Sequence, residues 1–236
     1  MIHLVEETGS TNADLAARLR AGEGWAEGSW RVARRQTAGR GRQGREWFDG
    51  AGNFMGSTVV QVGDTGAPPA SLSFVAALAV RDACAAAIGE GGSLSLKWPN
   101  DVLLDGGKLS GILLEMVRGA IIVGIGVNLA RAPQLPDRKT AALADVTAAP
   151  PLEDFAASLA AAFDRRLEAW RTYGLGATLQ AFLAGSIHAQ GSPLTVHDTD
   201  GSVLSGTFAG LEESDGALRL RLADGRERVI RAGDIS

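Results

Sequence analysis

The sequence predicts a mixed α/β domain followed by a small antiparallel β module. Up to about residue 190, short strand-like segments alternate with helical segments and are joined by Gly-rich turns. Beyond that point, short segments alternate apolar and polar residues and are separated by the turns "DTDG", "SDG" and "ADG". Hydrophobic residues form 45% and charged residues 21% of the 236-residue chain, which is typical of a globular protein and excludes disorder as a description of the whole chain.

The elements of the first domain can be placed in order along the chain. Residues 8–12 offer N-cap side chains for a short amphipathic helix with Leu15 and Leu19 on its apolar face. Ser71 is the predicted N-cap of a longer helix that is apolar nearly all round and therefore buried. The longer helices are expected at about 71–88, 152–171 and 175–184, and the strands at 29–35, 53–62, 93–98, 102–104, 108–117 and 120–129.

The C-terminal module differs from the rest of the chain in its pattern of apolar and polar residues. Its expected strands are 192–198, 202–211, 217–223 and 227–232. A unit of about 45 residues with this alternation is typical of a small barrel of the SH3 kind. We therefore place a catalytic or binding domain at residues 1–188 and the β domain at residues 189–236.

Charge is distributed unevenly along the chain. The formal net charge of −4 argues against a general binder of polyanions. Residues 31–45 nevertheless contain six arginines and no Asp or Glu. An acidic protein with its positive charge concentrated in one loop is predicted to bind one anionic ligand there.

Several features predict a cytoplasmic protein with no membrane partner. The N-terminal residues "MIHLVEETGS" lack the basic start and the apolar core of a signal peptide. The longest apolar stretch, "SLSFVAALAV", ends at Arg81 and Asp82, which we interpret as too short to span a bilayer. Cys84 is the only cysteine, so no disulfide can form within the chain, and we expect it to be a buried, small apolar residue.

Residue types that carry nucleophilic or metal chemistry are scarce. His3, His188 and His197 have no metal-ligand spacing among themselves, and the single cysteine cannot complete a site. No histidine lies between residues 4 and 187, so a Ser–His or Cys–His pair has nothing to build on. We expect the chemistry to rest on the positioning of substrates and on the charge of Arg and Lys.

The segment "RRQTAGRGRQGREW" (34–47) alternates Gly with Arg and ends in Trp47. "GRGRQG" fits G-x-G-x-x-G, but a dinucleotide fold needs a following helix, and "REWFDGAGN" contains none. An RNA-binding Arg/Gly segment would be longer and repeated. The pattern favours a loop that binds an anion through free amides and guanidinium groups, with a merely flexible loop as the alternative. Trp47 fits a base-stacking residue and a core aromatic about equally well.

Two further motifs lie on predicted strands. In "KWPND", Pro99 cannot donate to a sheet, so the strand must break there and expose Asn100 and Asp101, although an ordinary turn would look the same. In "GKLSGILLE", the period of 2 places Lys108 on one face and Gly111 on the other. A lysine at the start of a strand is usually a solvated end.

The motif "VGIGVN" places Gly124, Gly126 and Asn128 on one face of a strand. A strand face with two glycines and an amide is a place where something other than a side chain packs closely. A ligand fits this description, and so does a neighbouring backbone.

Taken together, these motifs resemble those of the biotin protein ligases. "STN" (10–12), "QTAGRGRQGREW" (36–47), "KWPND" (97–101), "GKLSGILLE" (107–115) and "GIGVN" (124–128) occur in that family's order and spacing. The resemblance covers nearly the whole chain. It implies an α+β fold with a mixed, mainly antiparallel sheet and helices, similar to class II aminoacyl-tRNA synthetases, plus a C-terminal SH3-like β-barrel.

The resemblance also implies a two-step reaction. Biotin's carboxylate attacks the α-phosphorus of Mg·ATP and gives biotinyl-5′-AMP and pyrophosphate. A lysine amine of a biotin carboxyl carrier domain then attacks the activated carbonyl. Biotin would be a substrate, and ATP and Mg²⁺ would be required.

Roles follow for the residues that match the motifs. Lys108 is similar to the lysine that bridges the biotin carboxylate and the α-phosphate. Arg42 is expected to retain the mixed anhydride, and Asp101 to help deprotonate the acceptor amine. The expected biotin contacts are Ser10, Thr11, Asn12, Gln36, Arg40, Gly41, Arg42, Lys108, Gly111, Gly124 and Gly126. The expected ATP or adenylate contacts are Arg40, Arg42, Trp47, Asn100, Lys108 and Asn128, with Mg²⁺ held by ATP and not by a protein cluster.

Two departures from the family's pattern affect these expectations. Many members carry an N-terminal helix-turn-helix, whereas here the first motif starts at residue 10, so a ligase without nucleic-acid binding is expected. Gln43 stands where some relatives have arginine, which puts the retention of the adenylate in doubt. A lipoate or octanoate protein ligase or transferase and a non-catalytic biotin-binding module are the alternative functions. A monomer and a sheet-edge homodimer both stay open.

Overall fold

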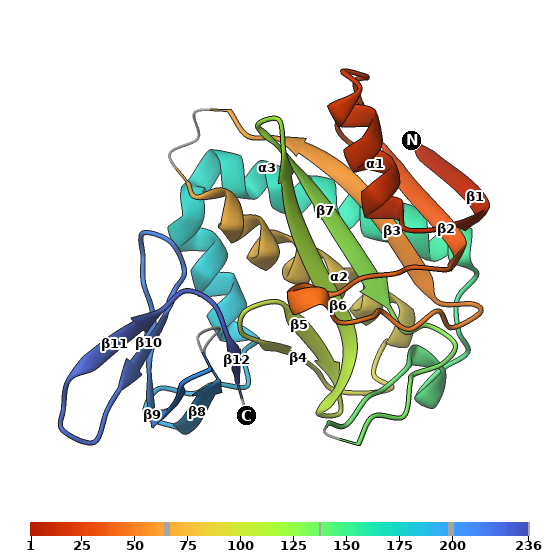
Figure 1. Cartoon of the computed structure of the whole chain (residues 1–236). Coiled ribbons are helices and arrows are strands. Elements are labelled where there is room, and N and C mark those ends of the chain that lie inside the picture. Colours follow the sequence, from red (N-terminus) through yellow and green to blue (C-terminus); the bar gives the residue numbers. More distant parts are fainter. Residues whose placement is uncertain (64–66, 137, 198–200, 236) are drawn as a thin grey trace.

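Two sheets organise the chain in the computed structural model, which describes residues 1–63, 67–136, 138–197 and 201–235 (Figure 1). The larger sheet has seven strands in the order β1-β2-β3-β7-β6-β5-β4. These strands are β1 (Ile2–Thr8), β2 (Trp30–Gln36), β3 (Phe54–Gln61), β4 (Leu94–Lys97), β5 (Asp101–Leu104), β6 (Gly107–Val117) and β7 (Ala120–Val127). β1 and β2 pair in parallel and the other neighbours pair antiparallel, so the prediction of a mixed, mainly antiparallel sheet is confirmed.

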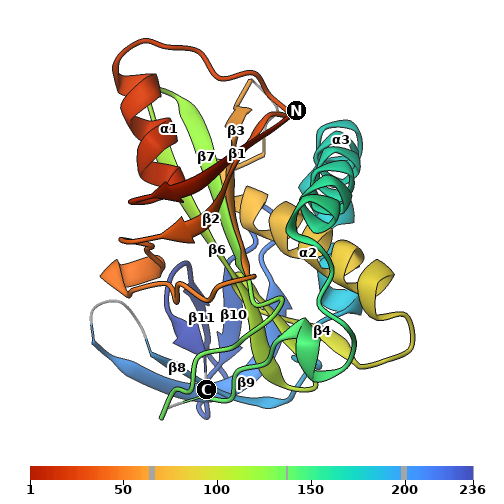
Figure 2. The same cartoon turned by 90° about the vertical axis from the view of Figure 1, so that its right-hand side faces the viewer.

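The helices cover the two faces of this sheet unequally. The short α1 (Thr11–Arg20) lies on one face, and α2 (Leu72–Ile88) and α3 (Leu152–Ala184) lie on the other (Figure 2). α3 is interrupted at Gly174, whose φ of 76° is not helical, so the predicted helices 152–171 and 175–184 are its two segments. Because α1 is short, it leaves part of its face of the sheet uncovered by helix.

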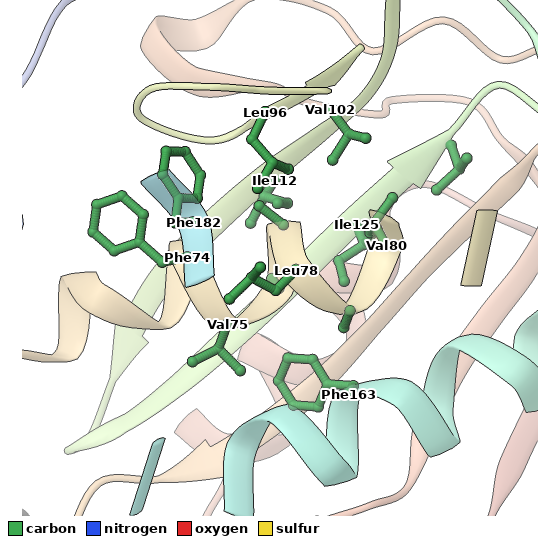
Figure 3. Packing of buried hydrophobic residues seen from close by; sticks show 14 of the residues in the cluster. Phe74, Val75, Leu78, Val80, Leu96, Val102, Ile112, Ile125, Phe163 and Phe182 are labelled. Atoms are coloured by element: carbon green, nitrogen blue, oxygen red, sulfur yellow. The ribbon is translucent and has the colours of Figure 1, made fainter. Parts of the chain in front are cut away.

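The main hydrophobic core fills the space between the sheet and the helices α2 and α3 (Figure 3). Side chains of α2 such as Leu78 and Val80 lie between strand residues such as Ile125 and the α3 residue Phe163. Aromatic edge contacts also join the sheet to α3, with ring centroids 5.4 Å apart for Trp30 and Phe163. This core holds one face of β6 and β7 rigidly, which fixes the position of their other face.

Two local predictions need correction. β1 was not among the predicted strands, because its burial does not alternate and its edge position leaves Glu6 and Glu7 exposed. Ser71 does not cap α2 through its side chain. Its hydroxyl donates to the Pro68 carbonyl at 2.6 Å and accepts from the Trp170 indole at 2.9 Å, so it ties the start of α2 to α3.

The apolar segment around α2 is longer than the sequence analysis allowed. Pro69–Ile88 has 20 residues and a mean hydropathy of 1.6 in its most apolar window, which is enough to cross a membrane by length and composition. In the folded chain, 67% of that window is buried. Burial between the sheet and α3 explains the composition, as expected for a core helix. Cys84 on this helix is fully buried, as predicted.

The C-terminal residues form a second, antiparallel sheet of five strands in the order β11-β10-β9-β8-β12. They are β8 (Pro193–His197), β9 (Val203–Leu211), β10 (Leu218–Arg221), β11 (Glu227–Ile230) and β12 (Asp234–Ile235). The predicted antiparallel module is confirmed, with the short β12 as an addition. The Trp98 indole donates to the Gly216 carbonyl at 3.1 Å and thereby connects the KWPND segment to this module.

His188 lies at the junction of the two sheets, with its ring centroid 5.7 Å from that of Phe208 on β9. Burial and the nearby charge of Lys97 lower the pKa of His188 from its ordinary 6.5 to about 4. The unfolded chain therefore takes up a proton near pH 6.5, and the folded protein does so only near pH 4. Acidification across this window stabilises the unfolded state relative to the folded state.

We predict that His188→Phe makes the melting temperature less dependent on pH between 6.5 and 4. The protonation of the unfolded chain lowers the free energy of unfolding of the wild type by up to about 3 kcal/mol, or roughly 6–12 °C in melting temperature for a chain of this size. Calorimetry at several pH values measures the difference, with His3→Phe on the exposed β1 as the control. A wild-type pH dependence in His188→Phe would contradict the prediction.

Candidate active site

A cavity of about 710 Å³ opens on the face of the sheet that α1 leaves uncovered. Its walls come from the start of α1, the 39–47 loop, the KWPND segment, strands β6 and β7, and the end of the C-terminal module. The structure brings together fourteen of the predicted site residues around this one cavity. They are Ser10, Thr11, Asn12, Gln36, Arg40, Gly41, Arg42, Trp47, Asn100, Asp101, Lys108, Gly111, Gly124 and Gly126.

The floor of the cavity has no side chains where β6 and β7 meet. Gly111 pairs directly with Gly126, and Gly124 lies two residues away on β7. A Cβ added to Gly126 would lie 2.2 Å from the Trp47 ring, and one added to Gly124 would lie 2.2 Å from Asn12 Oδ1. Neither contact is possible for real atoms, so the glycines are required by what lies on them.

Trp47 itself lies inside the cavity, against Gly126 and Gly111. Its indole nitrogen is buried and has no hydrogen-bond partner among the described residues. The ring is not part of the main core, and its buried N–H lies against Gly126 on the floor of the cavity.

One end of the cavity is neutral and polar. Gln36 Oε1 accepts from the Thr11 backbone N–H at 2.7 Å, and Thr11 Oγ1 lies 2.7 Å from Ser57 Oγ. The Ser57 hydroxyl donates to Asn12 Oδ1 at 2.6 Å. Asn12 Nδ2 in turn donates to Glu115 Oε2 at 2.6 Å. Ser10 caps α1 by accepting from Ala13 N at 3.5 Å, so the "STN" motif both starts the helix and lines the cavity.

The other end of the cavity is cationic. Lys108 Nζ donates to Asp101 Oδ1 at 2.6 Å. Arg42 donates to Asn100 Oδ1 at 2.8 Å and to the Gly233 carbonyl at 2.9 Å. Burial lowers the pKa of the Arg42 guanidinium and that of the Lys97 amine. The carboxylates of Asp101 and Asp234 act in the opposite direction on both groups. Desolvated cations of this kind gain most from an anionic ligand.

The period-2 prediction for "GKLSGILLE" was wrong about Lys108. Val102 pairs with Ser110, but Leu103 pairs with Lys108, so Leu109 is an extra residue in β6. This β-bulge turns Lys108 onto the same face as Gly111, where Nζ lies 3.6 Å from the position of a Cβ on Gly111. Lys108 therefore faces the cavity and is not a solvated strand end.

Asn128 is the predicted site residue that the structure places elsewhere. It is buried and does not line the cavity. Its Nδ2 donates to the Ala141 carbonyl at 3.1 Å and so fixes the chain after β7. The period-2 pattern that grouped it with Gly124 and Gly126 ends here, because β7 ends at Val127.

Sequence reasoning missed two groups of residues near the cavity. Ser57 and Glu115 hold Asn12 from behind, and a serine in the apolar strand "NFMGSTVVQV" was the available signal for the first. Asp234 of β12 contacts the Gly/Arg loop through Arg45 Nη2 at 2.8 Å. Its separation from the loop by 189 residues leaves no local signal in the sequence.

Comparisons with known proteins agree with this geometry. A sequence model of the Biotin/lipoate A/B protein ligase family matches residues 5–130, and one of the Biotin protein ligase C terminal domain matches residues 191–236. The chain belongs to the biotin/lipoate A/B protein ligase family. The first match contains the site motifs, and the second coincides with the C-terminal module.

Individual members of this family resemble the chain over nearly its whole length. It is 41% identical to the biotin–[acetyl-CoA-carboxylase] ligase of Paracoccus denitrificans, with 98% of each chain covered. It is 36% identical to that of Mycobacterium tuberculosis, covering 99% of this chain and 88% of the relative. A solved structure of the Aquifex aeolicus biotin protein ligase with biotin and ATP shares the fold, with a TM-score of 0.85, 24% identity, and coverage of 100% of this chain and 97% of that one.

We predict that Asp234→Ala loosens the 39–47 loop, because Arg45 loses its carboxylate partner and Arg42 a neighbouring charge at 4.0 Å. A partly exposed ion pair contributes about 1 kcal/mol, so tryptic cleavage after Arg42 or Arg45 should become about fivefold faster. Limited proteolysis followed by mass spectrometry measures this rate. Asp224→Ala removes the exposed partner of Arg226 and is the matched control. Equal cleavage in both variants would contradict the prediction.

Proposed function

We propose that the protein is an ATP-dependent biotin protein ligase. It joins biotin to the α-phosphate of ATP, releases pyrophosphate, and transfers the biotinyl group to a lysine of a biotin carboxyl carrier domain. The observation that carries this proposal is that one cavity joins a neutral polar end to a cationic end over a floor of glycines. The full-length similarity to two biotin–[acetyl-CoA-carboxylase] ligases supports the same activity.

The first step is an attack by a biotin carboxylate oxygen on the α-phosphorus of ATP. A C–O–P bond forms, the P–O bond to the β-phosphate breaks, and pyrophosphate leaves with the bond's electron pair. Lys108 can pair with the carboxylate and the α-phosphate together, since Asp101 and the sheet hold its amine in the cavity. Arg42 and Asn100 stand on the same side to bind the phosphate. The protein supplies charge and position, and no enzyme nucleophile is needed.

The second step uses the same groups. The acceptor amine attacks the biotinyl carbonyl carbon, an amide bond forms, and AMP leaves with the electrons of the C–O bond. The amine must lose a proton, and the Asp101 carboxylate, which lines the cavity beside Lys108, can accept it. The 39–47 loop, with Arg42 and Trp47, shields the anhydride from water until the amine arrives.

Mg²⁺ is expected to arrive with ATP. The described residues contain no group of three or more His, Cys, Asp or Glu that could hold a metal ion. The carboxylate of Asp101 is engaged by Lys108, and that of Asp234 by Arg45. These side chains do not form a dedicated magnesium-binding site, so the phosphates of the nucleotide would coordinate the ion.

The neutral end of the cavity favours biotin over lipoate or octanoate. Thr11, Asn12 and Gln36 are buried polar residues that bond to one another and to Ser57 and Glu115, and a hydrocarbon or disulfide end would offer no partner for the polar capacity that they have left. The Lys108–Asp101 pair and the half-buried Arg42 argue against a non-catalytic module, because simple binding of biotin needs no partly desolvated cations at its carboxyl end.

The acceptor domain and the location in the cell are also part of the proposed function. The acceptor is a carrier domain of acetyl-CoA carboxylase type, in keeping with the names of the relatives. We propose that the protein works in the cytoplasm and binds no nucleic acid. A net charge of −4 and a single buried cysteine support this assignment. A monomer and a sheet-edge homodimer are both compatible with the site.

We predict that Lys108→Ala lowers the initial rate of acceptor biotinylation by a factor of about 100 or more, because a charge at the reacting carboxylate and phosphate is lost. Intact-mass spectrometry of a biotin carboxyl carrier domain, incubated with Mg·ATP and biotin, measures the rate. Arg118→Ala, in the exposed turn between β6 and β7, is the control and should keep the wild-type rate.

Octanoate and lipoate are tested in parallel with biotin. A mass gain with one of these acids but not with biotin would move the protein to the lipoate side of the family. Tight biotin binding without any ATP-dependent mass gain would leave a binding module and overturn the proposal.

A further inference from the structure

We propose that Asn53, a buried residue that does not line the cavity, is a positioning residue that holds Lys108 in place for the reaction. This inference rests on the proposed function, because it concerns the amine that is assigned to the carboxylate and the α-phosphate. Asn53 lies directly before β3, and its side chain has no exposed surface. It therefore acts on the cavity only through the groups that it contacts.

The backbone of Lys108 is held by residues 139–141. The Lys108 N–H donates to the Lys139 carbonyl at 2.9 Å, and the Lys108 carbonyl accepts from the Ala141 N–H at 3.0 Å. A Cβ added to Gly107 would lie 2.9 Å from the Ala141 Cβ and from backbone atoms of this segment, so Gly107 lets the segment approach. The bulge that turns Lys108 into the cavity therefore rests on a segment outside β5 and β6.

Asn128 connects this segment to the other side of the bulge. Its backbone N–H donates to the carbonyl of Leu109, the extra residue of the bulge, at 2.9 Å. Its side-chain Nδ2 donates to the Ala141 carbonyl at 3.1 Å and to the Lys108 carbonyl at 3.4 Å. Both carbonyl groups of the bulge are thus bonded to Asn128, and Asn128 also holds the segment that supports Lys108.

Asn53 fixes Asn128 and the two residues that follow Leu129. Its Oδ1 accepts from the backbone N–H groups of Ala130 and Arg131 at 3.0 and 3.1 Å. Its Nδ2 donates to the Arg131 carbonyl at 2.7 Å and to Asn128 Oδ1 at 3.5 Å. The amide therefore uses both of its donor hydrogens and accepts two bonds at its oxygen, which no hydroxyl or carboxylate of the same size can do.

These contacts form a continuous path of hydrogen bonds from Asn53 to the backbone of Lys108. The Lys108 side chain extends from that backbone to Asp101 Oδ1, at 2.6 Å. A shift of the backbone displaces the amine, and misplacing a catalytic group by about 1 Å can lower a rate about a hundredfold. The neutral end of the cavity, where Gln36 accepts from Thr11, lies outside the path. Loss of Asn53 should therefore lower the rate of the first step more than the affinity for biotin.

A second route leads from Asn53 to the cavity. A Cβ added to Gly50 would lie 2.4 Å from Asn53 Nδ2, so Asn53 also packs against the chain that follows the 39–47 loop. Through this contact, a change at Asn53 would act on Trp47 and not on Lys108. The two routes can be separated, because an effect that passes through the Lys108 side chain disappears when that side chain is removed.

The experiment is a double-mutant cycle of Asn53→Ala and Lys108→Ala in the full chain. Calorimetry measures the affinities of all four proteins for biotin and for a sulfamoyl analogue of biotinyl-5′-AMP, which cannot transfer its biotinyl group. Single-turnover mass spectrometry measures the rate of biotinyl-5′-AMP formation from biotin and Mg·ATP. Melting temperatures are recorded for every variant.

Two further variants complete the design. Asn53→Asp keeps oxygens for the two backbone N–H groups but has no donor for Asn128, and it tests the inference if Asn53→Ala does not fold. Thr58→Val is the matched control, because Thr58 is a buried polar residue of β3 whose hydroxyl donates to the Ser29 carbonyl at 2.8 Å, away from the path.

We expect Asn53→Ala to lower the rate of biotinyl-5′-AMP formation by about tenfold or more and to change the affinity for biotin by less than about threefold. The affinity for the analogue should fall about tenfold in the wild-type background and less than about twofold in the Lys108→Ala background. Asn53→Asp should change all these quantities in the same direction. Thr58→Val should lower the melting temperature and leave the rate and both affinities within about twofold of the wild type.

An equal loss of analogue affinity in both backgrounds would overturn the inference, since Asn53 would then act through Trp47 or through general stability. An unchanged rate in the Asn53 variants, or the same loss of rate in Thr58→Val, would also overturn it. Failure of the proposed function would be seen in the wild type, which would not form biotinyl-5′-AMP. If the wild type is active but Lys108→Ala changes neither the rate nor the analogue affinity, the inference falls while the ligase activity stands.

Discussion

The absence of side chains at Gly111, Gly124 and Gly126 is the constraint on which the rest of the site depends. These glycines lie at the centre of the sheet, where β6 and β7 pair, and their neighbours Ile112 and Ile125 belong to the core under α2. The core therefore holds the floor in place from behind, and no Cβ projects into the cavity at these three positions. The missing side chains leave room for Trp47 and Asn12 to lie on the backbone, where both residues line the cavity between its two ends.

The two ends of the cavity are separate in chemistry and in origin. The neutral end is built by the first turn of α1 with β2, β3 and β6, all within the larger sheet and its helix. The cationic end draws on the 39–47 loop, the KWPND segment and the last strand of the C-terminal module. Asp234 and Gly233 hold Arg42 and Arg45, so a phosphate that binds these arginines competes with the C-terminal module for them. This couples the module to the nucleotide end of the site.

The residues that line the cavity could be proposed from the sequence because each motif lies in a short segment with a clear physical signal. Glycines on one strand face, a proline that ends a strand, and an arginine-rich loop can all be recognised locally. The sequence could not predict from which face of the sheet the Lys108 side chain projects, because the bulge at Leu109 depends on the pairing with β5. Asp234 and Glu115 could not be assigned to the site from the sequence either. Their hydrogen-bond partners, Arg45 and Asn12, lie 189 and 103 residues away. Asn128 was grouped with Gly124 and Gly126 by the alternation along the strand, but β7 ends one residue before it and Asn128 does not line the cavity.

The division between a neutral end and a cationic end explains how selectivity and reactivity coexist without an enzyme nucleophile. A uniformly cationic cavity would bind any carboxylate beside ATP, since Lys108 and Arg42 act on groups common to all acids. A uniformly neutral cavity would recognise the ring system but leave the phosphate charge without a partner. Joining the two over a glycine floor lets the neutral end select the acid and fix its orientation. The cationic end then acts only on the carboxylate that has been delivered to it, which is the condition for productive attack on the α-phosphorus.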